Sequence, residues 1–281
     1  MLIIGRTDLA SEAHRDLSRA KPLPGGSAKE ETLNGFPLYA VEITNEEGAR
    51  ALNKPEGKYF TLEPERFFER GSDSFAPAAK AVAQMIGSCS GGEVPSPVLV
   101  AALGNPDITP DALGPLTASH LIVTRHLKNS GDPVFSSFRS LALCRTGVLG
   151  TSGIESAQQI KTLCDLIHPQ LVIAVDALAG SDPSRLCRTI QVNSVGVAPG
   201  SGVGNDRDEL TLAYLGVPVV GIGVPTVIDS DLFGGENCKR MFVTPRNIDS
   251  LVRSAARLIG YGINLAVHKD LTIGDIDMLI G

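Results

Sequence analysis

Two uninterrupted apolar runs constrain the fold of this chain more than any other feature. They are VLVAAL at 98–103 and LVIAV at 171–175, and both are short and rich in β-branched residues. A strand that is apolar at every position must be covered on both faces, as in the interior of a parallel sheet. Further strand and helix patterns alternate along the chain. The sequence therefore predicts a doubly wound α/β fold, with a mostly parallel sheet and helices on both faces.

An aspartate accompanies each of these runs. Asp111 follows the first run across a loop rich in Gly and Pro, and Asp176 stands directly after the second. Open α/β sheets bind ligands outside the carboxyl ends of their strands, so both carboxylates are expected in one crevice. Two close carboxylates split their pKa values and can supply one acid and one base near neutral pH. The structural alternative for Asp111 is an N-cap of the helix predicted to follow it and to reach Leu127.

Other positions near the predicted carboxyl edge are candidate substrate-binding residues. The glycine-rich turn at 147–155 would offer backbone N–H groups and Thr151 to a substrate carbonyl, or be a turn in which Ser152 and Glu155 form a capping box. The run GSGVGN at 200–205 lacks the spacing of a dinucleotide fingerprint or a P-loop, so the wall of a peptide groove fits it better. The candidates for substrate binding are Asn105, Thr151, Gly200, Ser201, Gly202 and Asp229.

Weaker patterns predict the remaining elements. Residues 1–35 lack periodicity over most of their length, and PLPGGSAKEE within them is expected to be a surface connector. Two alternating runs could add an antiparallel edge to the sheet. The predicted elements are edge strands at 38–43 and 58–62, a strand at 140–145, a short polar strand at 189–195, an interior strand at 218–224, and helices at 76–86, 155–168 and 247–267.

Composition narrows the functional classes. The chain has 281 residues, 43% of them hydrophobic and 20% charged, and a net charge of −6 with scattered Lys and Arg, which argues against a nucleic-acid surface. Its five cysteines are widely spaced, without CxxC or metal-ligand spacing, as expected of thiols in a reducing compartment. No signal peptide or membrane-spanning run is recognisable. We therefore expect a cytoplasmic protein without a metal, a cofactor, or a membrane or nucleic-acid partner.

Six motifs, in order, resemble the spore germination endopeptidases that degrade small acid-soluble spore proteins. They are ALGNPDITPDALGP, HLIVTRHL, GTSGIES, VIAVDALA, APGSGVGNDRDEL and VPVVGIGVPTVID, and the resemblance runs with gaps from Arg6 to about His268. It implies that the substrates are small acid-soluble spore proteins, that the enzyme acts in the forespore or spore core, and that it is a homo-oligomer, by resemblance a tetramer. The element from Leu103 to Pro115 also resembles the strand–turn–Asp signature of hydrogenase-maturation peptidases, which have a doubly wound α/β fold.

The leader segment RTDLASE, Arg6 to Glu12, has two interpretations. Local rules predict the start of a helix, with Thr7 or Asp8 as N-cap and Glu12 in the first turn. In the resembled family this segment is the self-cleavage site of a zymogen, which implies a scissile bond between Asp8 and Leu9. The leader before Leu9 and the segment between Asp229 and Val243 are both shorter than the family pattern.

We therefore expect a single α/β peptidase domain over 1–281. Residues 1–8 are a candidate propeptide, 9–95 an N-terminal portion with edge strands, and 96–268 the catalytic core. The expected function is an endopeptidase in which Asp111 and Asp176 act as general acid and base, in an order that the sequence does not assign. Two alternatives are a metal-dependent peptidase of the hydrogenase-maturation type, although Ala198 stands where some relatives have His, and a nucleotide-binding regulator using 200–205.

Overall fold

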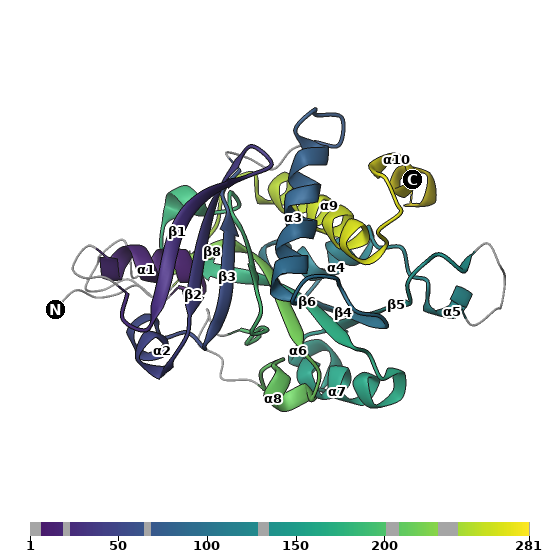
Figure 1. Ribbon diagram of the computed structural model, residues 1–281, viewed down its shortest axis with the longest axis horizontal. Coiled ribbons are helices and arrows are strands. Elements are labelled where there is room, and N and C mark those ends of the chain that lie inside the picture. Colours follow the sequence, from purple (N-terminus) through teal and green to yellow (C-terminus); the bar gives the residue numbers. More distant parts are fainter. Residues whose placement is uncertain are drawn as a thin grey trace.

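The sheet of this protein unites a parallel and an antiparallel half (Figure 1). The computed structural model describes residues 7–18, 23–64, 69–128, 135–200, 208–229 and 241–280. Within them the sheet has nine strands in the order β1-β2-β3-β7-β8-β6-β4-β5, and β9 pairs with β8. The strands are β1 Gly26–Leu33, β2 Phe36–Ile43, β3 Gly57–Leu62, β4 Val98–Leu103, β5 Leu141–Gly147, β6 Leu171–Gly180, β7 Ile190–Asn193, β8 Val219–Asp229 and β9 Phe242–Val243.

The α/β class is confirmed, whereas the expectation of a mostly parallel sheet holds for one half only. Strands β8, β6, β4 and β5 are parallel to one another. The pairs β1–β2, β2–β3, β3–β7, β7–β8 and β8–β9 are antiparallel. The apolar runs identified only the strands that are covered on both faces, and half-exposed antiparallel strands carry no such signal.

Helices cover both faces of the parallel half. In Figure 1, α3 and α9 lie above the sheet and α7 lies below it. One hydrophobic cluster packs Val100, Ile173 and Val175 with α3 and α9, and a second packs the alternate residues Leu99 and Ala174 with α7. The α-helices are α1 Ala10–Ser18, α2 Glu46–Leu52, α3 Phe75–Cys89, α4 Leu113–Ala118, α5 Arg125–Lys128, α6 Leu149–Ser152, α7 Ser156–Ile167, α8 Leu212–Leu215, α9 Ile248–Val267 and α10 Ile273–Ile280.

The N-terminal region is more regular than its sequence suggests. The predicted strands at 38–43 and 58–62 are confirmed as β2 and β3 of an antiparallel extension of the sheet, although neither is at its edge, because β1 pairs with β2 on the outer side. The predicted connector is wrong over residues 26–31, which belong to β1. Strand β1 pairs with β2 through a two-residue turn in which Asn34 and Gly35 have φ values of 50° and 88°. Asn-Gly is a favoured pair for such a hairpin turn. The sequence feature that indicates this hairpin is its Asn-Gly turn, because the polar strand GSAKEETL shows no hydrophobic alternation.

The predicted helix from Asp111 to Leu127 is wrong in extent. A 3₁₀ turn, Thr109–Asp111, precedes the short helix α4, which ends at Ala118. Two amides that would continue the helix are bonded elsewhere: Ile122 N donates to Asn264 Oδ1 of α9 at 3.0 Å, and Thr124 N donates to Leu141 O at 3.1 Å. Tertiary partners therefore replace the next helical turn.

The ends of the parallel strands are uneven. The ladder between β4 and β6 ends at the pair Ala102 and Val175, but β6 continues to Gly180 beside β8. Asp176 therefore lies within β6, and the expectation that it ends this strand is wrong. Asp176 is the first residue of β6 that has no pairing partner in β4. Beyond Asp176, β6 continues as a ribbon paired with β8.

The C-terminal helix is confirmed as α9, whereas α10 was not predicted. The capping box expected of Ser152 and Glu155 is also wrong. Ser152 is the last residue of α6, and Glu155 is the N-cap of α7 without a side-chain capping bond. In the described part of the chain, no helix combines the length and apolarity needed to cross a bilayer.

Helix α4 packs unusually closely on the central strands, and this generates a prediction. A Cβ at Gly114 would lie 2.2 Å from Leu103 O and 2.8 Å from Val175 O. Because both neighbours are backbone atoms of buried strands, Gly114→Ala should lower the free energy of unfolding by about 1–3 kcal/mol, as overpacking does. The matched control is Gly150→Ala, which meets no atom within 4 Å in α6. Denaturant unfolding should separate the two variants, and equal midpoints would contradict the close approach.

Candidate functional site

A large cavity opens where the two halves of the sheet meet. Its volume is about 1070 Å³, above the range of most small-ligand pockets and sufficient for a peptide segment. The β4 loop, the outer part of β6, strand β7, the segment after β7 and the loop between α2 and β3 line it. Asp111, Asp176, Asn105, Gly200 and Asp8 all line it, so the structure brings these five candidates from the sequence into one cavity.

Asp111 is held by its own loop. Its Oδ2 accepts a hydrogen bond from Asn105 N at 2.9 Å, and its backbone N donates to Ile108 O at 2.8 Å. Gly104 makes this closure possible, since its φ is 107° and a Cβ there would lie 2.0 Å from Asp111 O. The N-cap of α4 is Ala112, and α4 has no side-chain capping bond. The structural alternative for Asp111, a helix cap, is therefore wrong.

Asp176 is buried at the junction of β4, β6 and β8. Only 6% of it is exposed, and its Oδ1 accepts a hydrogen bond from Ala177 N at 2.9 Å. The close packing of Gly114 against Val175 O places the start of α4 beside the residue that precedes Asp176. The Asp111 loop is thereby fixed against the strand that carries Asp176.

The other candidates from the sequence lie around this cavity or away from it. Thr151 does not line it, and its hydroxyl donates to Val148 O at 2.9 Å, although Gly147 and Val148 do line it. Asp229 ends β8 opposite Phe242, beyond the part of β8 that lines the cavity. Leu9 is fully buried beneath the cavity rim. Ser201 and Gly202 lie outside the described residues.

The leader enters the cavity in a non-helical form. Helix α1 begins at Ala10, so the expected N-cap at Thr7 or Asp8 is wrong, whereas Glu12 is in the first turn as predicted. Asp8 N donates to Ala179 O at 2.9 Å, and Ala179 N donates to Asp8 Oδ2 at 2.8 Å. The outer ribbon of β6 therefore holds the Asp8 side of the Asp8–Leu9 bond.

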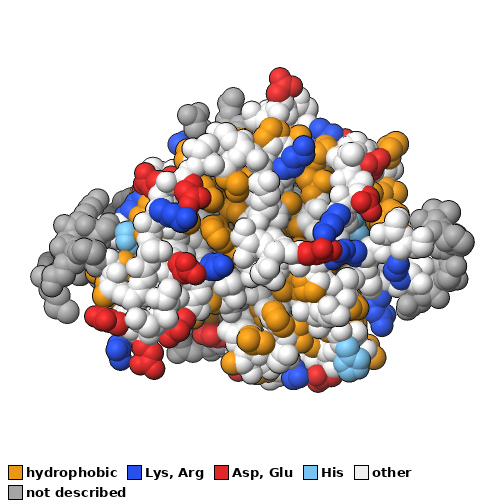
Figure 2. Space-filling model, viewed as in Figure 1, with side chains coloured by type: hydrophobic (Ala, Val, Ile, Leu, Met, Phe, Trp, Pro, Cys, Tyr) orange, Lys and Arg blue, Asp and Glu red, His pale blue; other side chains and the backbone are white. Residues whose placement is uncertain are grey.

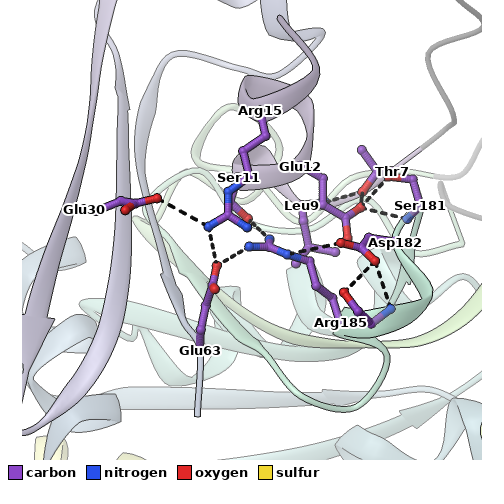
Figure 3. Close-up of polar contacts among 11 residues, drawn as sticks. Thr7, Leu9, Ser11, Glu12, Arg15, Glu30, Glu63, Ser181, Asp182 and Arg185 are labelled. Carbon is purple, nitrogen blue, oxygen red and sulfur yellow. Dashed lines mark hydrogen bonds and ion pairs between the residues drawn. The ribbon is translucent and has the colours of Figure 1, made fainter. Parts of the chain in front are cut away.

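The residues that follow this bond are held by a polar network (Figure 3). Glu12 Oε2 accepts hydrogen bonds from Ser181 N and Ser181 Oγ, at 2.7 and 2.8 Å, and from Thr7 Oγ1. Arg185 donates to Ser11 Oγ at 2.7 Å and also pairs with Glu63. The side chains of Asp8, Ser11 and Glu12 therefore have specific partners, which come from the end of β6 and the turn after it.

Two residues at this site were not identified from the sequence, Lys54 and Gln191. Lys54 Nζ donates to Thr7 O at 2.8 Å, and burial lowers the pKa of this ammonium against the opposing effect of the Asp8 and Glu12 carboxylates. Gln191 contacts the backbone of Asp8 and Ala10. For Gln191, the only sequence feature that pointed to a functional role was the polar composition of β7. No local sequence feature singled out Lys54.

The described cysteines are poor nucleophile candidates. Burial raises the pKa of Cys89 and of Cys187 to about 12, and it also raises the pKa of Cys144 and Cys164, so these thiols stay protonated. Cys238 lies outside the described residues. Over the same described ranges, no three His, Cys, Asp or Glu side chains are grouped as metal ligands would be.

Surface charge on the face shown in Figure 2 is mixed, with Lys and Arg side chains interspersed among Asp and Glu. Such an arrangement gives the field of this face no single sign.

Comparisons with known proteins identify the family of this chain. Residues 4–236 match the family model described as germination protease. A germination protease of Caldanaerobacter subterraneus subsp. tengcongensis is 37% identical, over 100% of this chain and 99% of the relative. One from Clostridium perfringens is 32% identical over 98% of both chains, and one from Geobacillus sp. is 39% identical over 80% of this chain and 64% of the relative. The extent of these matches shows that this chain belongs to the germination protease family.

Proposed function

We propose that this protein is an endopeptidase that hydrolyses small acid-soluble spore proteins during germination, with Asp111 and Asp176 as its acid–base pair. Membership of the germination protease family indicates a peptidase of spore germination. The observation that carries the finer proposal is that two carboxylates, from different strand and loop units, share one cavity with the leader peptide. The site of action is the forespore or spore core, and the resemblance favours a homo-oligomer, with a tetramer as the form to test.

The two carboxylates can divide the work of peptide hydrolysis. One accepts a proton from water as the water oxygen attacks the scissile carbonyl carbon. The other donates a proton to the amide nitrogen as the carbon–nitrogen bond breaks. Backbone N–H groups of Asn105 and Ala177 orient the two carboxylates, and these donors also favour the charged form of whichever aspartate acts as base.

The surroundings of the pair suit an extended peptide. Asp8 shows how such a chain is held, because it exchanges two hydrogen bonds with Ala179 in the manner of an added strand. Gly200 also lines the cavity, and a residue without a side chain lets an extended backbone approach closely. Five residues remain candidate substrate contacts: Asn105 of the β4 loop, Thr151 and Asp229 near the strand ends, Ser201 and Gly202.

The leader is proposed to be both a restraint and the first substrate. It occupies the cavity that a substrate peptide would need, and the Asp8–Leu9 bond precedes the helix, where a carbonyl is not committed to helical hydrogen bonds. The structure therefore requires no helix unwinding before the bond can be attacked.

The acid pair is tested by Asp111→Asn and Asp176→Asn. Each variant should fold normally and lose about 10²–10⁴-fold in kcat on an unfolded spore-protein substrate, as expected for a missing general acid or base. The double variant should be little slower than either single variant, because groups that act as a unit are not additive. The matched control is Asp107→Asn, an exposed carboxylate in the same loop. Near-native turnover by a single variant would remove that aspartate from the mechanism.

A second experiment addresses metal dependence. Activity should survive extended treatment with EDTA or 1,10-phenanthroline, because the described residues offer no cluster of ligands. Loss of activity on chelation, restored by one equivalent of a transition metal, would support the metal-dependent maturation peptidase instead and make Asp111 and Asp176 ligands.

The leader generates a third prediction. The full-length protein, incubated at mildly acidic pH, should cut itself between Asp8 and Leu9, because the competent pair carries one proton and acidification supplies it. Asp111→Asn should abolish this cut, whereas Asp107→Asn should not. Intact-mass measurement identifies the new N-terminus at Leu9, and an uncut chain with full activity would show that the leader is no restraint.

A further inference from the structure

One side chain spans the proposed scissile bond. Gln191 Nε2 donates to Asp8 O at 3.1 Å, and Gln191 Oε1 accepts from Ala10 N at 2.8 Å. The carbonyl of the Asp8–Leu9 peptide bond is that of Asp8, so the amide donor lies on the oxygen that gains charge during hydrolysis. Gln191 is only 3% exposed, and hydrogen bonds count for more where water is excluded.

The sheet places Gln191 in register with Asp176. In β8, Gly223 is the pairing partner of Gln191 in β7 on one side and of Asp176 in β6 on the other. Directly opposed residues project from the same face of a sheet, so both side chains point to the face that carries the cavity. A Cβ at Gly223 would lie 2.5 Å from Leu178 Cγ, so the Leu178 side chain covers the glycine that pairs with both residues.

We infer that Gln191 is a catalytic residue of the self-cleavage, the donor that stabilises the oxyanion formed on Asp8 O. This inference rests on the proposed function. When water adds to the carbonyl carbon, the π electrons move to the oxygen, whose negative charge accepts the hydrogen bond from Nε2. When the carbon–nitrogen bond breaks, these electrons return, and Leu9 N takes a proton from the acid of the pair. Gln191 transfers no proton, so it acts by electrostatics alone.

The second contact of Gln191 fixes the register of the bond. By accepting from Ala10 N, the side chain ties the first residue of α1 to β7 while its other end reaches the scissile carbonyl. An amide is the neutral side chain that offers both a donor and an acceptor. Glutamate of the same shape would keep the acceptor for Ala10 and lose the donor to Asp8 while charged.

The test compares Q191E, Q191M and Q170E in the full-length chain, with the first-order rate of the Asp8–Leu9 cut followed by intact mass. Gln170 is exposed and does not line the cavity, so Q170E introduces the same change of charge as Q191E but away from the site. Q191E and Q191M should cut about 10²–10³-fold more slowly near neutral pH, the effect of losing one oxyanion donor, and Q170E should match wild type. The ratio of the Q191E rate to the wild-type rate should rise as the pH falls, because a protonated carboxyl regains an O–H donor. The ratio for Q191M should stay flat.

Circular dichroism of each variant over the same pH range separates catalysis from folding, because the buried carboxylate of Q191E would also destabilise the fold until it is protonated. Cutting by Q191E and Q191M within about twofold of wild type would overturn the inference, given the loss expected of an oxyanion donor. So would a wild-type protein that digests a spore-protein substrate without cutting itself, which would leave the peptidase assignment intact. If Q191E and Q191M cut slowly while Asp111→Asn cuts at the normal rate, the proposed acid pair is overturned and the proposed role of Gln191 is retained.

Discussion

The parallel ladder of β4, β6 and β8 is the constraint on which the site depends. Strand β4 is buried at every position, and β6 is buried up to Asp176, so helices must cover both faces of these strands. Because the ladder between β4 and β6 ends at Val175, one position before Asp176, the loop after β4 begins beside Asp176. The close contact of Gly114 with Leu103 and Val175 then fixes the Asp111 loop at the same place. Two carboxylates are thereby held by the most rigid part of the molecule.

The unevenness of the strand ends has a second consequence. Ala179 lies in the outer part of β6, which pairs with β8, and Ser181 directly follows β6. These two residues bind the leader at Asp8 and Glu12. The same pair of strands therefore supplies the proposed chemistry at one level and the peptide-holding groups at the next. In the proposed function, a peptide aligned along this ribbon would pass the proposed acid pair at a fixed distance, as hydrolysis of one particular bond requires.

The polar network below the leader contributes to specificity more than to stability. Arg185 is 5% exposed and pairs with Glu63, and removing two charges from water offsets much of their attraction. What such a pair provides is a defined geometry, here the position of Ser11 at the start of α1. Lys54, whose pKa is lowered by burial, has the same role at Thr7. The leader is thus held by contacts that depend on its sequence.

The sequence by itself determined the α/β class, the buried strands β4 and β6, helix α9 and the presence of an aspartate beside each buried strand, because continuous or periodic burial leaves a local pattern. It missed β1, whose polar residues leave no such pattern, and it extended the helix after Asp111 through Ile122 and Thr124, whose amides bond to distant partners. Only the tertiary structure decided which groups meet in the cavity. Gln191 reaches Asp8 across 183 positions of chain through the pairing of β7, β8 and β6, and no local pattern specifies a contact made by strand order.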